Sequence, residues 1–162
     1  MNAKRIWILG GTASGKTTLA KKISKKLKIP FYSTDDFIYK KKWSEKYSDD
    51  VQIRKLDRVV RGASWIIEGV HKNEWVNSSI KKADLIIFLD MKKFRLLSRV
   101  VKRQRSRKKD NEPGSGFSDL MKLLWWVFTH MPKDYKKYKN EKPDFVILKN
   151  PRQVNNFLED LK

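Results

Sequence analysis

Short apolar runs alternate with longer amphipathic stretches along this chain. The runs are rich in β-branched and aromatic residues, as buried strands are, and they occupy residues 6–9, about 31–32, 65–67, 85–89 and 145–148. Between them, apolar residues recur at the three- and four-residue spacing of a helix face. Strands separated by helices are typical of a parallel sheet covered on both faces. We therefore expect a three-layer α/β fold with a five-stranded parallel sheet.

Three stretches carry helices that would cover this sheet. After the first run, leucine or isoleucine recurs every fourth residue, which predicts a helix that ends near Lys28. A charged stretch at about residues 40–64 predicts a small helical insertion, whose apolar face consists of Ile53, Leu56, Val59 and Val60. Pro151 opens a last helix over residues 151–161.

The first apolar run leads directly into a segment that fits the phosphate-binding pattern G-x-x-x-x-G-K-[ST] without a mismatch. The pattern requires a strand before it and a helix after it, and both are predicted here. We expect this segment to bind the phosphates of a nucleoside triphosphate. Its residues are Gly10, Gly11, Thr12, Ala13, Ser14, Gly15, Lys16, Thr17 and Thr18.

The residue types of this segment explain the expected chemistry. Glycines let the backbone approach a ligand and point successive N–H groups at phosphate oxygens. The helix that follows adds unpaired N–H groups and a positive dipole end. Lys16 would reach the β- and γ-phosphates and act in catalysis, and the Thr17 hydroxyl would coordinate Mg²⁺. The alternative is an ordinary glycine-rich turn between a strand and a helix.

Acidic residues follow three of the predicted strands. Because ligands of an open α/β sheet lie outside the carboxyl ends of the strands, these carboxylates should lie beside the phosphate-binding segment. Asp35 and Asp36 could hold a water of the Mg²⁺ shell, accept a proton from an attacking hydroxyl, or cap a helix. Glu68 and Asp90 each suit the Walker B position, whose acid holds the metal's water shell. The sequence does not decide between Glu68 and Asp90 for the Walker B position, and Asp90 could instead cap the next helix.

The stretch from Met91 to Lys109 contains no acidic residue and ten basic ones. Its apolar positions are at helical spacing and begin at Phe94, so the stretch predicts an amphipathic helix with a cationic face. A flexible Pro- and Gly-containing segment follows, and we expect a basic lid at about residues 99–116. Arg99 and Arg103 are candidates to stabilise charge on a transferring phosphoryl group. A solvated or nucleic-acid-binding helix is the alternative.

Residues 117–131 are the most apolar stretch of the second half of the chain. Its length and the polar residues Asp119 and Lys122 fall short of a membrane span. We expect a core helix, with a helix that binds a membrane surface or a partner as the alternative.

The chain is strongly basic, with 38 Lys and Arg against 18 Asp and Glu and a formal net charge of +20. Such a surface attracts polyanions, including nucleic acid, at low salt, although a solvated lysine-rich surface is the alternative. Cysteine is absent, which excludes disulfides and thiolate metal sites. The length of 162 residues suits one domain over residues 1–162. The apolar start is too short for a signal peptide, and we expect a cytoplasmic protein.

In the order of its motifs, the chain resembles the P-loop kinases related to adenylate kinase, and most closely the bacterial topology modulation proteins. The resemblance covers nearly the whole chain. It rests on residues 10–17, residues 34–39 with Trp43, residues 65–69, residues 83–90 and residues 99–103.

This resemblance implies an ATP site at the phosphate-binding segment and a mobile basic lid. It also implies that Glu68 is the Walker B acid and that Arg152 lies in a loop near the adenine. Val70 and His71 replace the proline and arginine of adenylate kinases, which argues against AMP as the acceptor.

These observations predict a kinase that uses ATP and Mg²⁺ to phosphorylate a small nucleotide-like or hydroxyl-bearing acceptor. A nucleic-acid-binding ATPase or a regulator of DNA topology is the second hypothesis, for which the net charge of +20 is the reason. A membrane-surface protein that uses Trp125 and Trp126 is a third.

Overall fold

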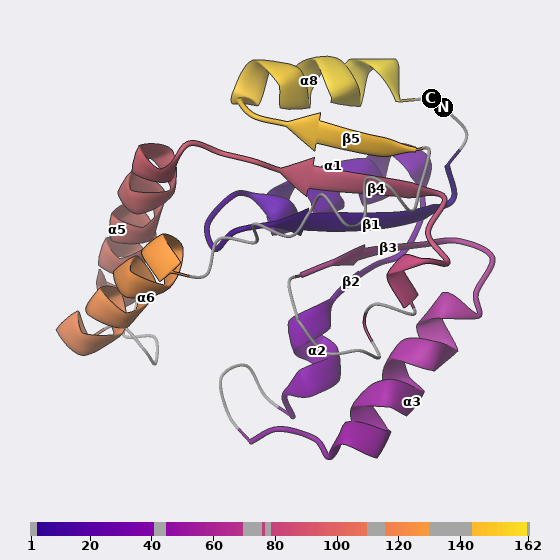
Figure 1. Ribbon diagram of the computed structural model, residues 1–162, viewed down its shortest axis with the longest axis horizontal. Helices are drawn as coiled ribbons and strands as arrows, with labels where there is room; N and C mark the ends of the chain where they lie inside the picture. Colours follow the sequence, from indigo (N-terminus) through magenta and orange to yellow (C-terminus); the bar gives the residue numbers. More distant parts are fainter. Residues whose placement is uncertain are drawn as a thin grey trace.

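A computed structural model describes residues 3–40, 45–69, 76, 79–109, 116–129 and 144–161, with only the backbone of residues 103, 107–109 and 126–129. Its centre is a five-stranded sheet in the order β2-β3-β1-β4-β5 (Figure 1). All four pairings are parallel. The strands are β1 (Arg5–Gly10), β2 (Phe31–Ser33), β3 (Trp65–Glu68), β4 (Leu85–Leu89) and β5 (Phe145–Leu148). The predicted parallel sheet is confirmed.

Helices follow the strands as the spacing of apolar residues predicted. They are α1 (Lys16–Leu27), α2 (Thr34–Ile38), α3 (Asp49–Val60), α5 (Lys93–Lys109), α6 (Phe117–Thr129) and α8 (Pro151–Asp160). Helix α1 ends where it was expected, because Lys28 takes a left-handed conformation with a φ of 56°.

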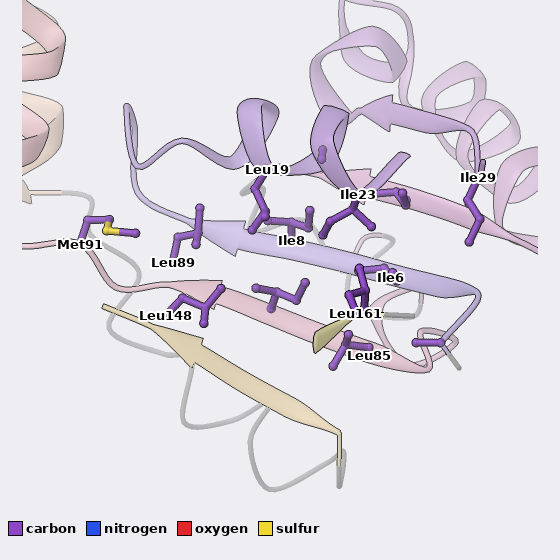
Figure 2. Packing of buried hydrophobic residues seen from close by; sticks show 14 of the residues in the cluster. Ile6, Ile8, Leu19, Ile23, Ile29, Leu85, Leu89, Met91, Leu148 and Leu161 are labelled. Carbon is purple, nitrogen blue, oxygen red and sulfur yellow. The ribbon is translucent and has the colours of Figure 1, made fainter. Parts of the chain in front are cut away.

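Two apolar clusters lie on the two faces of the sheet. Successive side chains of a strand point to opposite faces, so Ile6 and Ile8 of β1 belong to one cluster and Trp7 and Leu9 to the other. The first cluster contains α1 and α8, and Figure 2 shows its close packing around β1 and β4. The second contains α3. Helices therefore cover both faces, as expected for three layers.

The apolar face predicted for residues 40–64 is partly wrong. Leu56 and Val60 are buried, but Ile53 is exposed and Gln52 is buried in its place. Gln52 tolerates burial because its side-chain amide donates a hydrogen bond to the Tyr47 carbonyl at 2.7 Å. The helix belongs to the second core cluster, where it packs against the sheet face opposite α1.

The prediction that residues 117–131 form a core helix holds for one face of α6 only. Leu120, Leu123 and Leu124 are half-buried against the first cluster. The opposite face is exposed over Phe117, Met121 and Trp125, and Phe94 of α5 is exposed too rather than part of the buried stripe. The reason is that α5 and α6 lie side by side beyond the carboxyl ends of β4 and β5, at the margin of the core (Figure 1). Over the described ranges, no helix is long and apolar enough to cross a membrane.

An ion pair joins the start of β1 to the start of β4. Arg5 Nε donates to Asp84 Oδ1 at 2.9 Å, and the backbone N–H groups of Lys4 and Arg5 donate to Asp84 Oδ2. The hydrogen-bonded Arg5 side chain holds the pKa of the Asp84 carboxyl below its ordinary value. The carboxylate therefore stabilises the amino-terminal edge of the sheet when it is ionised.

The Asp84→Asn variant should lower the free energy of unfolding by about 1 kcal/mol at neutral pH. A carboxyl with a lowered folded pKa contributes stability above its unfolded pKa of about 3.9 and loses it as pH falls through the folded value. The difference from wild type should therefore shrink below about pH 4, as measured by urea unfolding at several pH values. Asp160→Asn, at an exposed carboxylate of α8, is the control. An equal difference at all pH values would contradict this role of Asp84.

Candidate nucleotide-binding site

The phosphate-binding segment joins β1 to α1 in a backbone conformation that requires glycine. Gly10 has a φ of +150° and Gly15 a φ of +101°, both in the region that side chains disfavour. A Cβ at Gly10 would lie 2.9 Å from Leu89 Cβ and from Ser14 Oγ. The first glycine of the motif is thus needed because β4 and the segment itself press against β1 at this point.

The phosphate-binding segment offers hydrogen-bond donors to a bound anion. Gly15 is the N-cap of α1 without a side-chain cap, and the first turn of α1 contains no acidic residue. The Ser14 side chain is 2% exposed, and its hydroxyl oxygen has no hydrogen-bond partner among the described residues. Buried hydroxyls normally have partners, and a helix N-terminus attracts phosphate. These features fit the phosphates of a nucleotide.

Two of the basic residues predicted for the site donate hydrogen bonds to backbone carbonyls of the phosphate-binding segment. Lys16 Nζ donates to the Gly11 carbonyl at 2.9 Å. Arg99 Nη1, which comes from α5, donates to the Ser14 carbonyl at 2.8 Å and lies 3.4 Å from the Ala13 carbonyl. Helix α5 therefore contacts the phosphate-binding segment through Arg99. The backbone of Arg103 lies in α5, and its side chain is outside the described part.

A buried carboxylate connects α1 to two strands. Glu68 is 5% exposed at the end of β3. Its Oε1 accepts hydrogen bonds from the Thr17 hydroxyl and the Ser33 hydroxyl, each at 3.0 Å. Glu68 pairs with Ile8 on one side and with Ser33 on the other, and Ile8 belongs to the cluster that contains α1. The sheet register therefore turns Glu68 toward Thr17.

The alternation of residues along β4 predicts a different sheet face for Asp90 from that of Glu68. Leu85, Ile87 and Leu89 of β4 face α1, whereas the residues between them face the cluster that contains α3. Continued alternation puts Asp90 on the α3 side. Its backbone N–H donates to the Leu148 carbonyl at 3.0 Å. Of the two acids, the one hydrogen-bonded to Thr17 is Glu68.

The two aspartates after β2 differ in their contacts. Ser33 is the N-cap of α2, and Asp36 Oδ2 accepts from the Ser33 N–H at 3.3 Å, which completes a capping box. Asp35 is half-buried one residue earlier. Asp36 thus takes the capping role, which is one of the roles predicted for this pair of aspartates.

Two residues of the site were missed in the sequence. Ser33 donates a hydrogen bond to the Glu68 carboxylate. The only sequence feature that could have pointed to Ser33 is its place three residues before Asp36, which is the spacing of a capping box. Gly69 has a φ of +146°, and a Cβ there would lie 1.7 Å from Thr34 Oγ1. The chain after Glu68 therefore passes directly against the start of α2.

A cavity of about 440 Å³ lies between α5 and the start of α8. It is lined by Arg95, Asn150, Pro151 and Arg152. Asn150 caps α8 through a 3.0 Å bond from the Gln153 N–H to its side-chain oxygen. The cavity brings Arg152 together with Arg95, which belongs to the basic stretch from Met91 to Lys109 but precedes the lid expected at about residues 99–116.

Within the described ranges, no group of three or more His, Cys, Asp or Glu side chains could hold a metal ion. Mg²⁺ is usually bound by one or two protein ligands together with water and substrate phosphates. The pair of Thr17 and Glu68 suits that mode of binding.

Comparisons with known protein families and with curated proteins found no match. Solved structures do match. The shikimate kinase of Acinetobacter baumannii in complex with shikimate has a TM-score of 0.62 at 15% identity, over 99% of this chain and 91% of that one. The shikimate kinase of Bacteroides thetaiotaomicron has a TM-score of 0.58 at 18% identity, over 98% and 96%. That of Aquifex aeolicus has a TM-score of 0.53 at 20% identity, over 97% and 95%.

These similarities show that the chain has the fold of P-loop kinases of the shikimate kinase type. The narrower resemblance to topology modulation proteins is not confirmed by them. Val70 and His71, on which the argument against AMP rested, lie outside the described residues, as does Trp43.

The Gly69→Ala variant should lower the free energy of unfolding by about 1–3 kcal/mol, because it combines an unfavourable φ with a clash against Thr34. The double variant Gly69→Ala/Thr34→Ala should regain part of that loss, since the clashing side chain is removed. Chemical denaturation measures both. Gly116→Ala is the control, because its Cβ would meet only the end of the Asp119 side chain. Equal stability of Gly69→Ala and Gly116→Ala would contradict the close approach.

Proposed function

We propose that this chain is a phosphotransferase that uses ATP and Mg²⁺ to phosphorylate a small nucleotide-like or hydroxyl-bearing acceptor. The observation that carries the proposal is the bond from Thr17 to the buried Glu68 beside a glycine-dependent phosphate-binding segment. In the proposed site, this pair would supply a metal-binding hydroxyl and a carboxylate next to the donors for the phosphates. The kinase fold of the structural relatives supports the same conclusion.

The triphosphate would be held by residues 10–18. Lys16 already lies on this segment, where its ammonium group satisfies the Gly11 carbonyl. In the proposed reaction Lys16 neutralises charge on the β- and γ-phosphates, and Arg99 adds a second positive charge from α5. Arg103 is proposed to act with Arg99. Arg152 and the cavity beside it would accept the base of the nucleotide.

Thr17 and Glu68 would hold Mg²⁺, Thr17 through its hydroxyl oxygen and Glu68 through the water shell. The ion, when bound, neutralises phosphate charge and orients the γ-phosphoryl group. We do not assign Asp90 to the metal, because continued alternation beyond β4 would put it on the α3 side, away from Thr17.

Asp35 is proposed as the base on the acceptor side. It would accept the proton of the attacking hydroxyl while the acceptor oxygen bonds to the γ-phosphorus and the bond from that phosphorus to the bridging oxygen breaks, releasing ADP. The start of α2 lies against Gly69 and is capped by Ser33, so Asp35 stands on a fixed backbone. Positioning of this kind supplies much of the rate in phosphoryl transfer.

A second candidate function is that of a nucleic-acid-binding ATPase. Exposed cations on α5 and before it, including Lys92, Lys93, Arg95, Lys102 and Arg105, favour it. Binding through phosphate contacts should weaken steeply with salt, whereas phosphorylation of a small acceptor should respond less. A single cytoplasmic domain remains our expectation under either function.

ATP consumption with Mg²⁺ tests the proposal directly, against nucleoside monophosphates, nucleosides, shikimate, other small hydroxyl compounds and single- and double-stranded DNA. We expect one small acceptor to stimulate turnover and to be recovered with one added phosphate by mass spectrometry. Lys16→Ala should reduce this turnover by about 100-fold or more without unfolding the protein. Lys22→Ala, at an exposed lysine of the same helix, is the control. Stimulation by DNA alone, fading with salt, would replace the first function by the second.

Glu68→Gln and Asp90→Asn separate the two Walker B candidates. Glu68→Gln should lower Mg²⁺-dependent turnover by about 100-fold, because it removes the charge beside Thr17, and Asp90→Asn should lower it far less. Turnover at increasing Mg²⁺ concentration measures both effects. A larger loss in Asp90→Asn would overturn the assignment of Glu68.

A further inference from the structure

Ser33 occupies the boundary between the metal side and the acceptor side of the proposed site. Its hydroxyl donates to Glu68 Oε1 at 3.0 Å, the same oxygen that accepts from Thr17. The Ser33 hydroxyl oxygen also accepts from the Asp35 N–H at 3.4 Å as the N-cap of α2. One side chain therefore contacts both the carboxylate of β3 and the helix that carries Asp35.

The backbone fixes Ser33 in this position. Ser33 is the last residue of β2 and pairs with Glu68 of β3 in the parallel register. Its N–H is held by Asp36 Oδ2 at 3.3 Å. Strand pairing on one side and the capping box on the other leave the hydroxyl aimed at Glu68.

Glu68 depends on such donors because it is 5% exposed. A buried carboxylate is stable only when hydrogen bonds replace its lost water. One of its hydroxyl donors, Thr17, belongs to the helix that follows the phosphate-binding segment, and the other belongs to the sheet. Ser33 can thus hold the Glu68 carboxylate in place while Thr17 serves the metal.

We propose that Ser33 is a positioning residue that orients the Glu68 carboxylate toward bound Mg²⁺. This inference rests on the proposed function, because it takes Glu68 as the metal-side acid. Ser33 acts through Glu68 and does not itself coordinate the ion.

The Ser33→Ala variant removes the hydroxyl that donates a hydrogen bond to Glu68. Partners of metal-site residues typically change metal affinity by about 10- to 100-fold when they are lost. We expect Ser33→Ala to reduce the gain in ATP affinity that Mg²⁺ provides by about 10-fold, with the affinity for metal-free ATP unchanged. Ser33→Thr keeps the hydroxyl and should retain the gain.

Ser33 also has a structural role as the N-cap of α2. The variants must therefore separate the loss of this cap from the loss of Glu68 positioning. Glycine is a much better N-cap than alanine, so Ser33→Gly removes the hydroxyl with little loss of capping and should show the same loss of Mg²⁺ dependence as Ser33→Ala. Ser24→Ala is the matched control, because the Ser24 hydroxyl donates to the Ile29 carbonyl at 2.6 Å, within α1 and its following turn. It removes a serine hydrogen bond without touching Glu68.

Calorimetric titration of ATP into each full-length protein, with Mg²⁺ and separately with EDTA, gives the ratio of the two affinities. Thermal unfolding of the same samples reports the capping role. In a Glu68→Gln background, Ser33→Ala should cause little further change in the ratio, because both substitutions act on one contact.

A lowered ratio in Ser33→Ala and Ser33→Gly, with the wild-type ratio in Ser33→Thr and Ser24→Ala, supports the inference. A wild-type ratio in Ser33→Ala together with a lower unfolding temperature would overturn it and leave Ser33 as a helix cap only. Failure of the proposed function is distinguishable, since it shows in the wild-type protein as ATP binding that does not depend on Mg²⁺ or as no binding.

Discussion

The parallel pairing of β1 with β3 on one side and with β4 on the other determines where the phosphate-binding segment and Glu68 lie. It sets Glu68 opposite Ile8 and Leu89 opposite Gly10. Residues paired across parallel strands share a face of the sheet. The phosphate-binding segment, the buried carboxylate and the helix that carries Thr17 therefore meet at the carboxyl edge of the sheet, where ligands of open α/β folds bind.

Close approach of the backbone is the second constraint. Gly10 leaves no room for a side chain between Leu89 and Ser14, and Gly69 leaves none beside Thr34. These two contacts press the segment against β4 and press the end of β3 against α2. The functional side chains consequently project from backbone that cannot easily shift, which is the kind of support that a precisely positioned reaction needs.

The helices α5 and α6 contribute differently to the site. Helix α5 supplies Arg99, which binds the carbonyls of the phosphate-binding segment, and Arg95, which lines the neighbouring cavity. It is packed on the core through Leu96 and Val100, while α6 keeps Phe117 and other apolar residues exposed. The whole chain has a net charge of +20, so positive charge near the candidate site is expected from composition alone. Arg99 is distinguished from the other basic residues by its hydrogen bond to the Ser14 carbonyl.

The sequence by itself determined the five-stranded parallel sheet, the phosphate-binding segment and the candidate acids, because apolar runs, glycines and Lys16 are local signals. It could not choose between Glu68 and Asp90, because strands that are buried on both faces show no alternation of polar and apolar residues. Only the tertiary register showed that Glu68 lies on the same face as α1, and only packing showed that Ser33 contacts Glu68. The sequence also could not predict that α6 is covered on one face alone, because the burial of a helix depends on what packs against it.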